Sequence, residues 1–136
     1  EFLNEIIKIA EVQATDHEVN IKVNVQNSGK ITFDYQQMKQ VFINLIRNAV
    51  EASHKGGEIN IDFTSSKKGN VFIISDNGSG ISRENLKKIF DIYFTTKNNG
   101  TGMGLSIVRQ IILQHNGTIE VESVINKGSK FIITLP

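Results

Sequence analysis

Two asparagines lie one helical turn apart, at Asn44 and Asn48, in a stretch whose apolar residues recur at helical spacing. On a helix the apolar side chains form one arc, and both asparagines fall on the opposite arc together with Arg47 and Glu51. Asparagine is a poor helix former, so helix stability does not explain the pair. The pair either serves chemistry or is an ordinary polar face whose amides bond nearby backbone.

A first glycine-rich loop, Asp76 to Gly80, directly follows an apolar run that is typical of a buried strand. Gly78 and Gly80 permit positive φ angles and would let a flat ligand approach the backbone closely. Asp76 could accept a hydrogen bond from an amine such as the exocyclic group of adenine. The alternative is a simple turn, because Asp-Asn-Gly is common turn chemistry.

A second glycine-rich loop runs from Asn98 to Leu105 and leads directly into a predicted helix. Free N–H groups and the positive end of the helix dipole make such a place suited to an anion. The spacing matches neither a dinucleotide-binding fingerprint nor a Walker A loop. A loop without a ligand is the alternative.

The segment between the two loops is aperiodic and carries aromatic residues. Phe90 and Phe94 are expected to anchor it to the core, and Lys97 could reach a phosphate or remain solvated. The histidines at positions 17, 54 and 115 show no metal-ligand spacing, so we interpret them as structural.

Composition narrows the class of protein. The 136 residues suffice for one domain, residues 1–136, with a real core. A net charge of +1 gives no electrostatic reason to expect nucleic acid as a partner, and no apolar run reaches membrane-spanning length. The absence of cysteine fits a reducing compartment and excludes thiolate chemistry. Because the chain opens in mid-pattern without Met, we expect a fragment of a longer protein.

Periodicity predicts the elements that position these residues. Helices are expected over 2–14, 35–54, 83–89 and 105–115, with Asp34 and Ser82 as N-caps. Strands are expected over 19–25, 31–33, 59–63, 71–74, 119–121 and 131–135. Helices thus alternate with strand pairs. The pattern favours an α/β two-layer sandwich: a mixed, mostly antiparallel sheet of about five strands packed under about three helices.

Four segments together resemble the catalytic ATP-binding domain of two-component sensor histidine kinases, within the group that includes gyrase B, Hsp90 and MutL. Residues 44–49 resemble the N box and residues 76–81 the G1 box. Residues 90–97 resemble the F box and residues 100–105 the G2 box. All four occur in family order over nearly the whole chain. The Phe-Thr-Thr-Lys and Arg-Asn-Ala-Val-Glu-Ala sequences are similar to the nitrogen-regulator and sporulation-kinase style.

The resemblance implies roles for particular residues. Asn48 is expected to coordinate the Mg²⁺ that bridges the ATP phosphates, with Asn44 lining the same site, and Asp76 to bind the adenine amine. The G2 glycines would form a mobile ATP lid that Thr96 and Lys97 help to position. The implied catalytic residues are Asn44, Asn48 and Lys97. The implied nucleotide-binding set is Asn44, Asn48, Asp76, Gly78, Gly80, Ile81, Phe90, Thr96, Lys97, Gly100, Thr101, Gly102, Met103, Gly104 and Leu105.

The sequence departs from the family pattern at two places. Many members carry Lys where this chain has Glu51, so Arg47 or Lys97 could supply the positive charge, and Glu51 could simply pair with Arg47. In the F box, Ile92 and Tyr93 stand where Pro and Phe are common.

The resemblance also implies a reaction and partners. Related ATPases have a Glu general base at the position of Asn44, and an Asn cannot take a proton. The expected chemistry is therefore phosphoryl transfer to a histidine on a dimerisation hairpin of the same protein, for relay to a response-regulator receiver domain. We expect this fragment to be a monomer from a homodimeric, cytoplasmic protein, with membrane anchorage of the longer protein left open. An anti-sigma-type serine kinase and a non-catalytic nucleotide-sensing module are the alternatives.

Overall fold

The computed structural model describes residues 2–26, 33–91 and 104–136. Within these ranges every helix is too short or too polar to cross a lipid bilayer. Four helices are described: α1 (Phe2–Asp16), α2 (Tyr35–Ala52), α3 (Arg83–Leu86) and α4 (Gly104–Gln114). Five strands are described: β1 (Asn20–Gln26), β2 (Glu58–Ser66), β3 (Gly69–Asp76), β4 (Thr118–Val124) and β5 (Gly128–Leu135).

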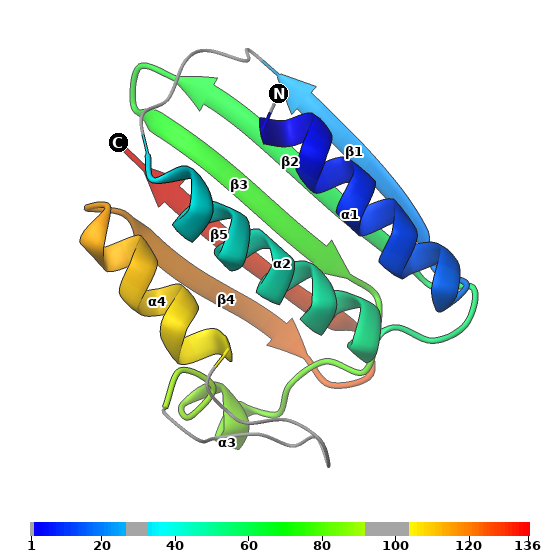
Figure 1. The fold of residues 1–136 in the computed structure, drawn as a ribbon. Helices are drawn as coiled ribbons and strands as arrows, with labels where there is room; N and C mark the ends of the chain where they lie inside the picture. The colour runs from blue at the N-terminus through cyan, green and yellow to red at the C-terminus, as the bar shows by residue number, and fades with distance from the viewer. Residues whose placement is uncertain (1, 27–32, 92–103) are drawn as a thin grey trace.

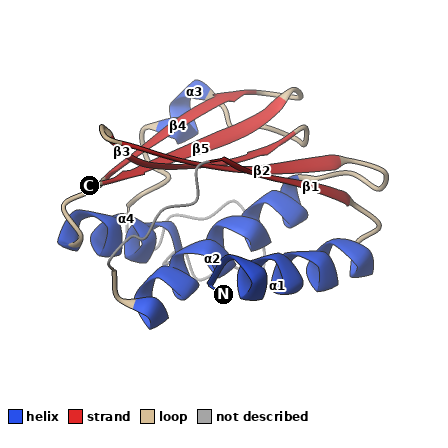
Figure 2. Cartoon of the chain, turned by 90° about the horizontal axis from the view of Figure 1, so that it is seen from above, coloured by secondary structure: helices blue, strands red, loops and turns tan. Residues whose placement is uncertain are grey.

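The five strands form one sheet in the order β1-β2-β3-β5-β4. β1 pairs with β2 in parallel, and the other three pairings are antiparallel. Helices α1, α2 and α4 lie side by side over one face of the sheet (Figure 1), and the edge-on view separates the two layers (Figure 2). The expected two-layer sandwich with a mixed, mostly antiparallel sheet is confirmed.

Helix α2 begins and ends where local chemistry predicts, to within two residues. The Asp34 side chain caps its start by accepting the Gln37 N–H at 2.9 Å. The helix ends at Ala52 because Ser53 is extended, and the Ser53 hydroxyl donates to Ala49 O at 2.7 Å. The short strand predicted over 31–33 lies mostly outside the described residues, and the one described member, Phe33, is not in a strand.

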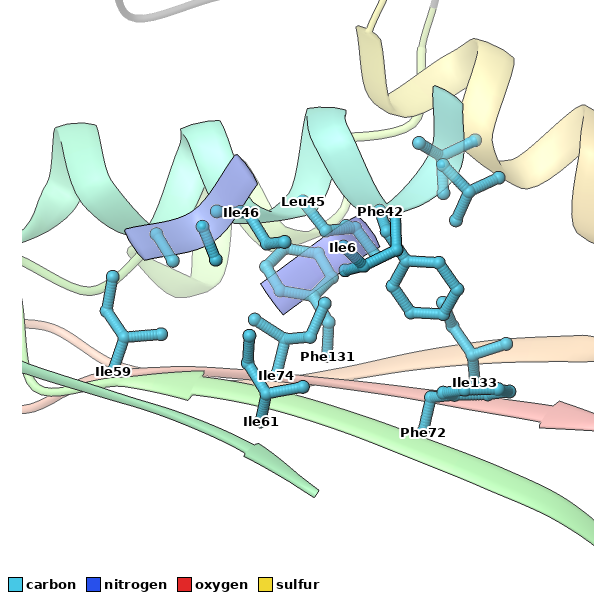
Figure 3. Packing of buried hydrophobic residues seen from close by; sticks show 14 of the residues in the cluster. Ile6, Phe42, Leu45, Ile46, Ile59, Ile61, Phe72, Ile74, Phe131 and Ile133 are labelled. Carbon is cyan, nitrogen blue, oxygen red and sulfur yellow. The ribbon is translucent and has the colours of Figure 1, made fainter. Parts of the chain in front are cut away.

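The core lies between the helices and the inner face of the sheet (Figure 3). Phe42 and Leu45 of α2 are almost completely buried, and the Phe42 ring lies 4.8 Å from that of Phe72 on β3. Full burial of one such side chain contributes about 1.5–3 kcal/mol, so this arc of α2 fixes the helix on the sheet. The opposite arc, with both asparagines, is thereby held at a defined place.

Candidate functional site

Helix α2 carries the paired asparagines along one side. Asn44, Asn48 and Ala52 follow at intervals of four residues, which places them near one another along the helix surface. Asn44 and Asn48 are half-buried, whereas Arg47 and Glu51 are exposed. The polar arc predicted from the sequence is therefore divided. Its two amides are partly covered, and its two charged side chains are exposed.

The start of α4 lies against the first asparagine. A side chain placed on Gly104 would meet the Asn44 amide, whose Oδ1 lies 3.7 Å from the ideal Cβ position, and no other atom of the described residues within 4 Å. The N-terminus of α4 thus lies against the Asn44 amide. The next residue, Leu105, packs against the core and anchors this end of the helix.

The Asp76 carboxylate stands at the end of β3, half-buried. Its Oδ1 accepts the Gly78 N–H at 2.9 Å, and the N–H of Ser129 on β5 donates to the same carboxylate. Burial raises the pKa of Asp76 above its ordinary value, although these two hydrogen bonds act in the opposite direction. The carboxylate is consequently fixed in orientation by the backbone and only partly hydrated, which suits an acceptor for a ligand amine.

The loop after Asp76 packs on the C-terminal end of α2 (Figure 1). The Ser79 N–H donates to Ala52 O at 3.0 Å, and an added Cβ on Gly78 would lie only 2.1 Å from that same oxygen. Asn77 ties the loop to β2, because its Oδ1 accepts the Glu58 N–H at 2.9 Å. The Asp76 loop therefore meets α2 one turn beyond Asn48, and the start of α4 meets α2 one turn before it.

The other side of the Asp76 loop packs on the turn between β4 and β5. Gly80 has a φ of +72°, and an added Cβ would lie 2.2 Å from Val124 O. The Ile81 N–H donates to the Ser123 hydroxyl at 2.7 Å, and Ser123 Oγ lies 2.8 Å from Ser129 Oγ. Both glycines of the loop thus face protein backbone in the direction a side chain would take, and close packing requires them.

The sequence interpretation missed the two serines. Ser123 and Ser129 lie more than 40 residues after Asp76 in the chain, and neither belongs to a motif that we recognised. The one available signal was the turn over 126–128, which predicts that the two strands on either side pair across from each other.

The remaining predicted site residues divide into two groups. Ile81 and Phe90 are half-buried and pack against the core, as expected for the anchors of a loop. Six predicted residues lie outside the described part of the chain: Thr96, Lys97, Gly100, Thr101, Gly102 and Met103.

Two of the three histidines have structural hydrogen bonds. His115, just after α4, accepts the Asp34 N–H through Nε2 at 3.0 Å, and its Nδ1 lies 2.8 Å from Ile111 O. The same side chain thereby joins the end of α4 to the start of α2. His17 Nδ1 lies 3.0 Å from Gln13 O at the end of α1. These contacts agree with the structural interpretation of both residues.

The oxygen donors that the described residues bring to this site are the Asn44 and Asn48 amides and the Asp76 carboxylate. No group of three or more His, Cys, Asp or Glu side chains in the described ranges could hold a metal ion. Mg²⁺ commonly binds through one or two protein oxygens together with phosphates and water. Asn48, one turn after the residue that Gly104 approaches, would offer an oxygen, the N-terminus of α4 would offer a place for anionic phosphates, and Asp76 would offer an acceptor for a base.

Comparison with known proteins identifies the class of protein that this fold and site define. Residues 33–136 match the family model described as histidine kinase-, DNA gyrase B- and HSP90-like ATPase. The chain belongs to this family of ATPases, and it is the catalytic, ATP-binding domain of a histidine kinase.

Individual relatives agree with this assignment. Sporulation kinase C of Bacillus subtilis (strain 168) is 37% identical over 98% of this chain, and the sensor histidine kinase ZraS of Escherichia coli (strain K12) is 36% identical over 98%. The chain covers 33% and 29% of their lengths, so it spans about a third of these curated relatives.

Solved structures share the fold. The catalytic domain of the histidine kinase ThkA, in a nucleotide-free form, superposes with a TM-score of 0.86 at 33% identity and covers 99% of this chain and 90% of that one. The mycobacterial sensor histidine kinase MprB has the same fold, with a TM-score of 0.85 at 24% identity over 98% of this chain and 95% of that one.

Proposed function

We propose that residues 1–136 form one domain that binds Mg·ATP between α2, the Asp76 loop and the start of α4. The observation that carries this proposal is the placement of Asn48 between two contacts on α2. Gly104 approaches Asn44, one turn before Asn48, and Gly78 approaches Ala52, one turn after Asn48. A base held at the Asp76 loop and phosphates held at the α4 N-terminus would therefore meet beside Asn48.

Asp76 would accept a hydrogen bond from the adenine amine. Its orientation is already set by the N–H groups of Gly78 and Ser129, so little freedom is lost when the base binds. The preference for adenine follows from the same contact, because guanine carries a carbonyl oxygen where adenine carries the amine. That oxygen would face the carboxylate and be repelled.

Asn48 would hold Mg²⁺ through its amide oxygen, and Asn44 would line the phosphate end of the site. The metal, when bound, supplies charge neutralisation to the phosphates. Neither amide can take a proton, so this chain has no base at these positions to activate water. The residues accordingly favour positioning a phosphoryl group for transfer to a protein side chain over rapid hydrolysis.

The acceptor would be a histidine on a helical hairpin of the longer protein, followed by relay to an aspartate of a response-regulator receiver domain. We propose a monomeric chain here, a homodimeric parent and a cytoplasmic location for the domain. These assignments rest on the family and on the names of longer relatives, which are sensor and sporulation kinases.

The test is phosphoryl transfer. The chain is mixed with the hairpin of its parent protein and ATP labelled on the γ-phosphate, with Mg²⁺ present. We expect an acid-labile, base-stable phosphoprotein on the hairpin. Acid-stable phosphate on a serine of another protein would favour the serine-kinase alternative. No transfer, with Mg·ATP demonstrably bound, would contradict the proposed activity.

A further inference from the structure

Ser123 on β4 uses its whole hydrogen-bonding capacity beside the Asp76 loop. Its Oγ accepts the Ile81 N–H at 2.7 Å and lies 2.9 Å from Gly128 O and 2.8 Å from Ser129 Oγ. A hydroxyl has one proton and two lone pairs. All three contacts are satisfied together when Ser123 donates to Gly128 O and accepts from Ile81 N–H and the Ser129 hydroxyl.

Each of these three partners is connected to the Asp76 loop. Ser129 donates its backbone N–H to the Asp76 carboxylate. Gly128, at a φ of +122°, lies so close to Asp76 that an added Cβ would be 2.0 Å from Asp76 O. Ile81 is the residue at which the loop leaves the site. Ser123 therefore links β5, the strand whose Ser129 N–H orients the Asp76 carboxylate, to Ile81 at the far end of the Asp76 loop.

A second hydrogen bond, from the turn between β4 and β5, also holds the Asp76 loop. The Asn126 N–H donates to Ser79 O at 2.7 Å, and Asn126 adopts a left-handed φ of 65° to do so. The segment from Ser79 to Ile81 is thus held by two hydrogen bonds from the β4–β5 hairpin. Only the bond at Ile81 depends on a side chain, so only Ser123 can be altered without changing the backbone.

We propose that Ser123 is a positioning residue for base recognition: through Ile81, Gly128 and Ser129 it fixes the Asp76 carboxylate, and so sets both the affinity for ATP and the preference for adenine over guanine. The inference rests on the proposed function, since it concerns the same nucleotide site. Ser123 does not itself touch the base in this account.

The experiment compares three variants with the wild-type chain in calorimetric titrations with Mg·ATP and Mg·GTP. Ser123→Ala removes the hydroxyl, and Ser123→Thr keeps it. Ser65→Ala is the matched control, because the half-buried Ser65 hydroxyl donates to Asn70 Oδ1 at 2.7 Å at the far end of the sheet. Thermal unfolding of every variant reports general loss of stability.

Loss of one neutral hydrogen bond that holds the loop should weaken ATP binding about three- to tenfold in Ser123→Ala. GTP binding should change less, so the ratio of ATP to GTP affinity should fall. Ser123→Thr should recover the ATP affinity. Ser65→Ala should lower the melting temperature to a similar extent and leave both affinities unchanged.

Three results would overturn the inference. The first is unchanged ATP affinity in Ser123→Ala. The second is an equal loss of ATP affinity in Ser65→Ala, which would indicate a general structural effect. The third is a folded Ser123→Thr variant that binds ATP as weakly as Ser123→Ala. A wild-type chain that does not bind Mg·ATP would instead overturn the proposed function, and this inference with it.

Discussion

Replacing Gly80 by alanine should destabilise the protein more than replacing Gly56 by alanine, although both glycines have positive φ angles. Gly56 has a φ of +82° with no atom of the described residues within 4 Å of an added Cβ, and Gly80 has a φ of +72° with Val124 O at 2.2 Å. The left-handed conformation costs an alanine about 1–2 kcal/mol at either place.

Gly80→Ala carries a second cost, because its Cβ and Val124 O must move apart by more than an ångström to reach ordinary contact. Overpacking of this kind typically costs about 1–3 kcal/mol. The free energy of unfolding should therefore fall by about 2–5 kcal/mol in Gly80→Ala and by about 1–2 kcal/mol in Gly56→Ala. ATP affinity should fall only in Gly80→Ala, because only that loop carries Asp76.

Urea unfolding and ATP titration of the two variants measure these quantities side by side. Equal destabilisation by the two substitutions would refute the claim that the Asp76 loop packs against the β4–β5 hairpin. A Gly80→Ala protein that is strongly destabilised, yet binds ATP as the wild type does when folded, would refute the link between that packing and the site.

Two further substitutions test the carboxylate and the histidine contacts. Asp76→Asn should weaken ATP binding about 10- to 100-fold. The substitution should not lower the free energy of unfolding at pH 7. Because the folded-state pKa of Asp76 is raised, the protonated carboxyl stabilises the fold at pH values below its ordinary pKa. This contribution is lost as pH rises through the folded-state pKa. The melting temperatures of Asp76→Asn and wild type should thus converge as pH falls. An Asp76→Asn variant clearly less stable than wild type at pH 7 would contradict the claim that burial disfavours the charged carboxylate. His115→Ala should lower the free energy of unfolding by about 0.5–1.5 kcal/mol, through the lost bond to the Asp34 N–H, and leave ATP affinity unchanged. The matched variant His17→Ala loses only a contact within its own helix end and should cost less; equal losses would refute the role of His115 between α2 and α4.

Local sequence patterns predicted most of the fold because each depends on neighbouring residues. Asp34 caps α2 as expected, and the apolar alternation on either side of residues 67–68 produced the β2–β3 hairpin. The ends of α1, α2 and α4 shifted by one or two residues, as where α2 stops at Ala52 because Ser53 is extended. The helix predicted over 83–89 is three residues too long, since α3 ends at Leu86. The resemblance to histidine kinase domains predicted the family, and the family match confirms that prediction.

The tertiary contacts of the site could not be predicted in the same way. The pairing of β1 with β2 in parallel joins segments separated by an entire helix. The reason for glycine at Gly78 and Gly80 is the backbone of Ala52 and Val124, and no local pattern connects either pair. Ser123 looks like any polar residue in an alternating strand, and only the fold shows that it reaches Ile81.

The Mg²⁺ dependence of ATP binding to the wild-type chain and to Asn48→Ala tests whether α2 holds the metal of the nucleotide site. ATP is titrated into each protein with Mg²⁺ and with EDTA in its place. The matched control is Asn60→Ala. Asn60 lies on β2, and its Nδ2 is 3.4 Å from Glu58 Oε1.

We expect Mg²⁺ to strengthen ATP binding in the wild type and in Asn60→Ala. In Asn48→Ala that gain should be lost, while the weaker binding in EDTA, which depends on Asp76, remains. An Asn48→Ala protein that keeps the full Mg²⁺-dependent gain would contradict the assignment of α2 as the metal-holding side of the site.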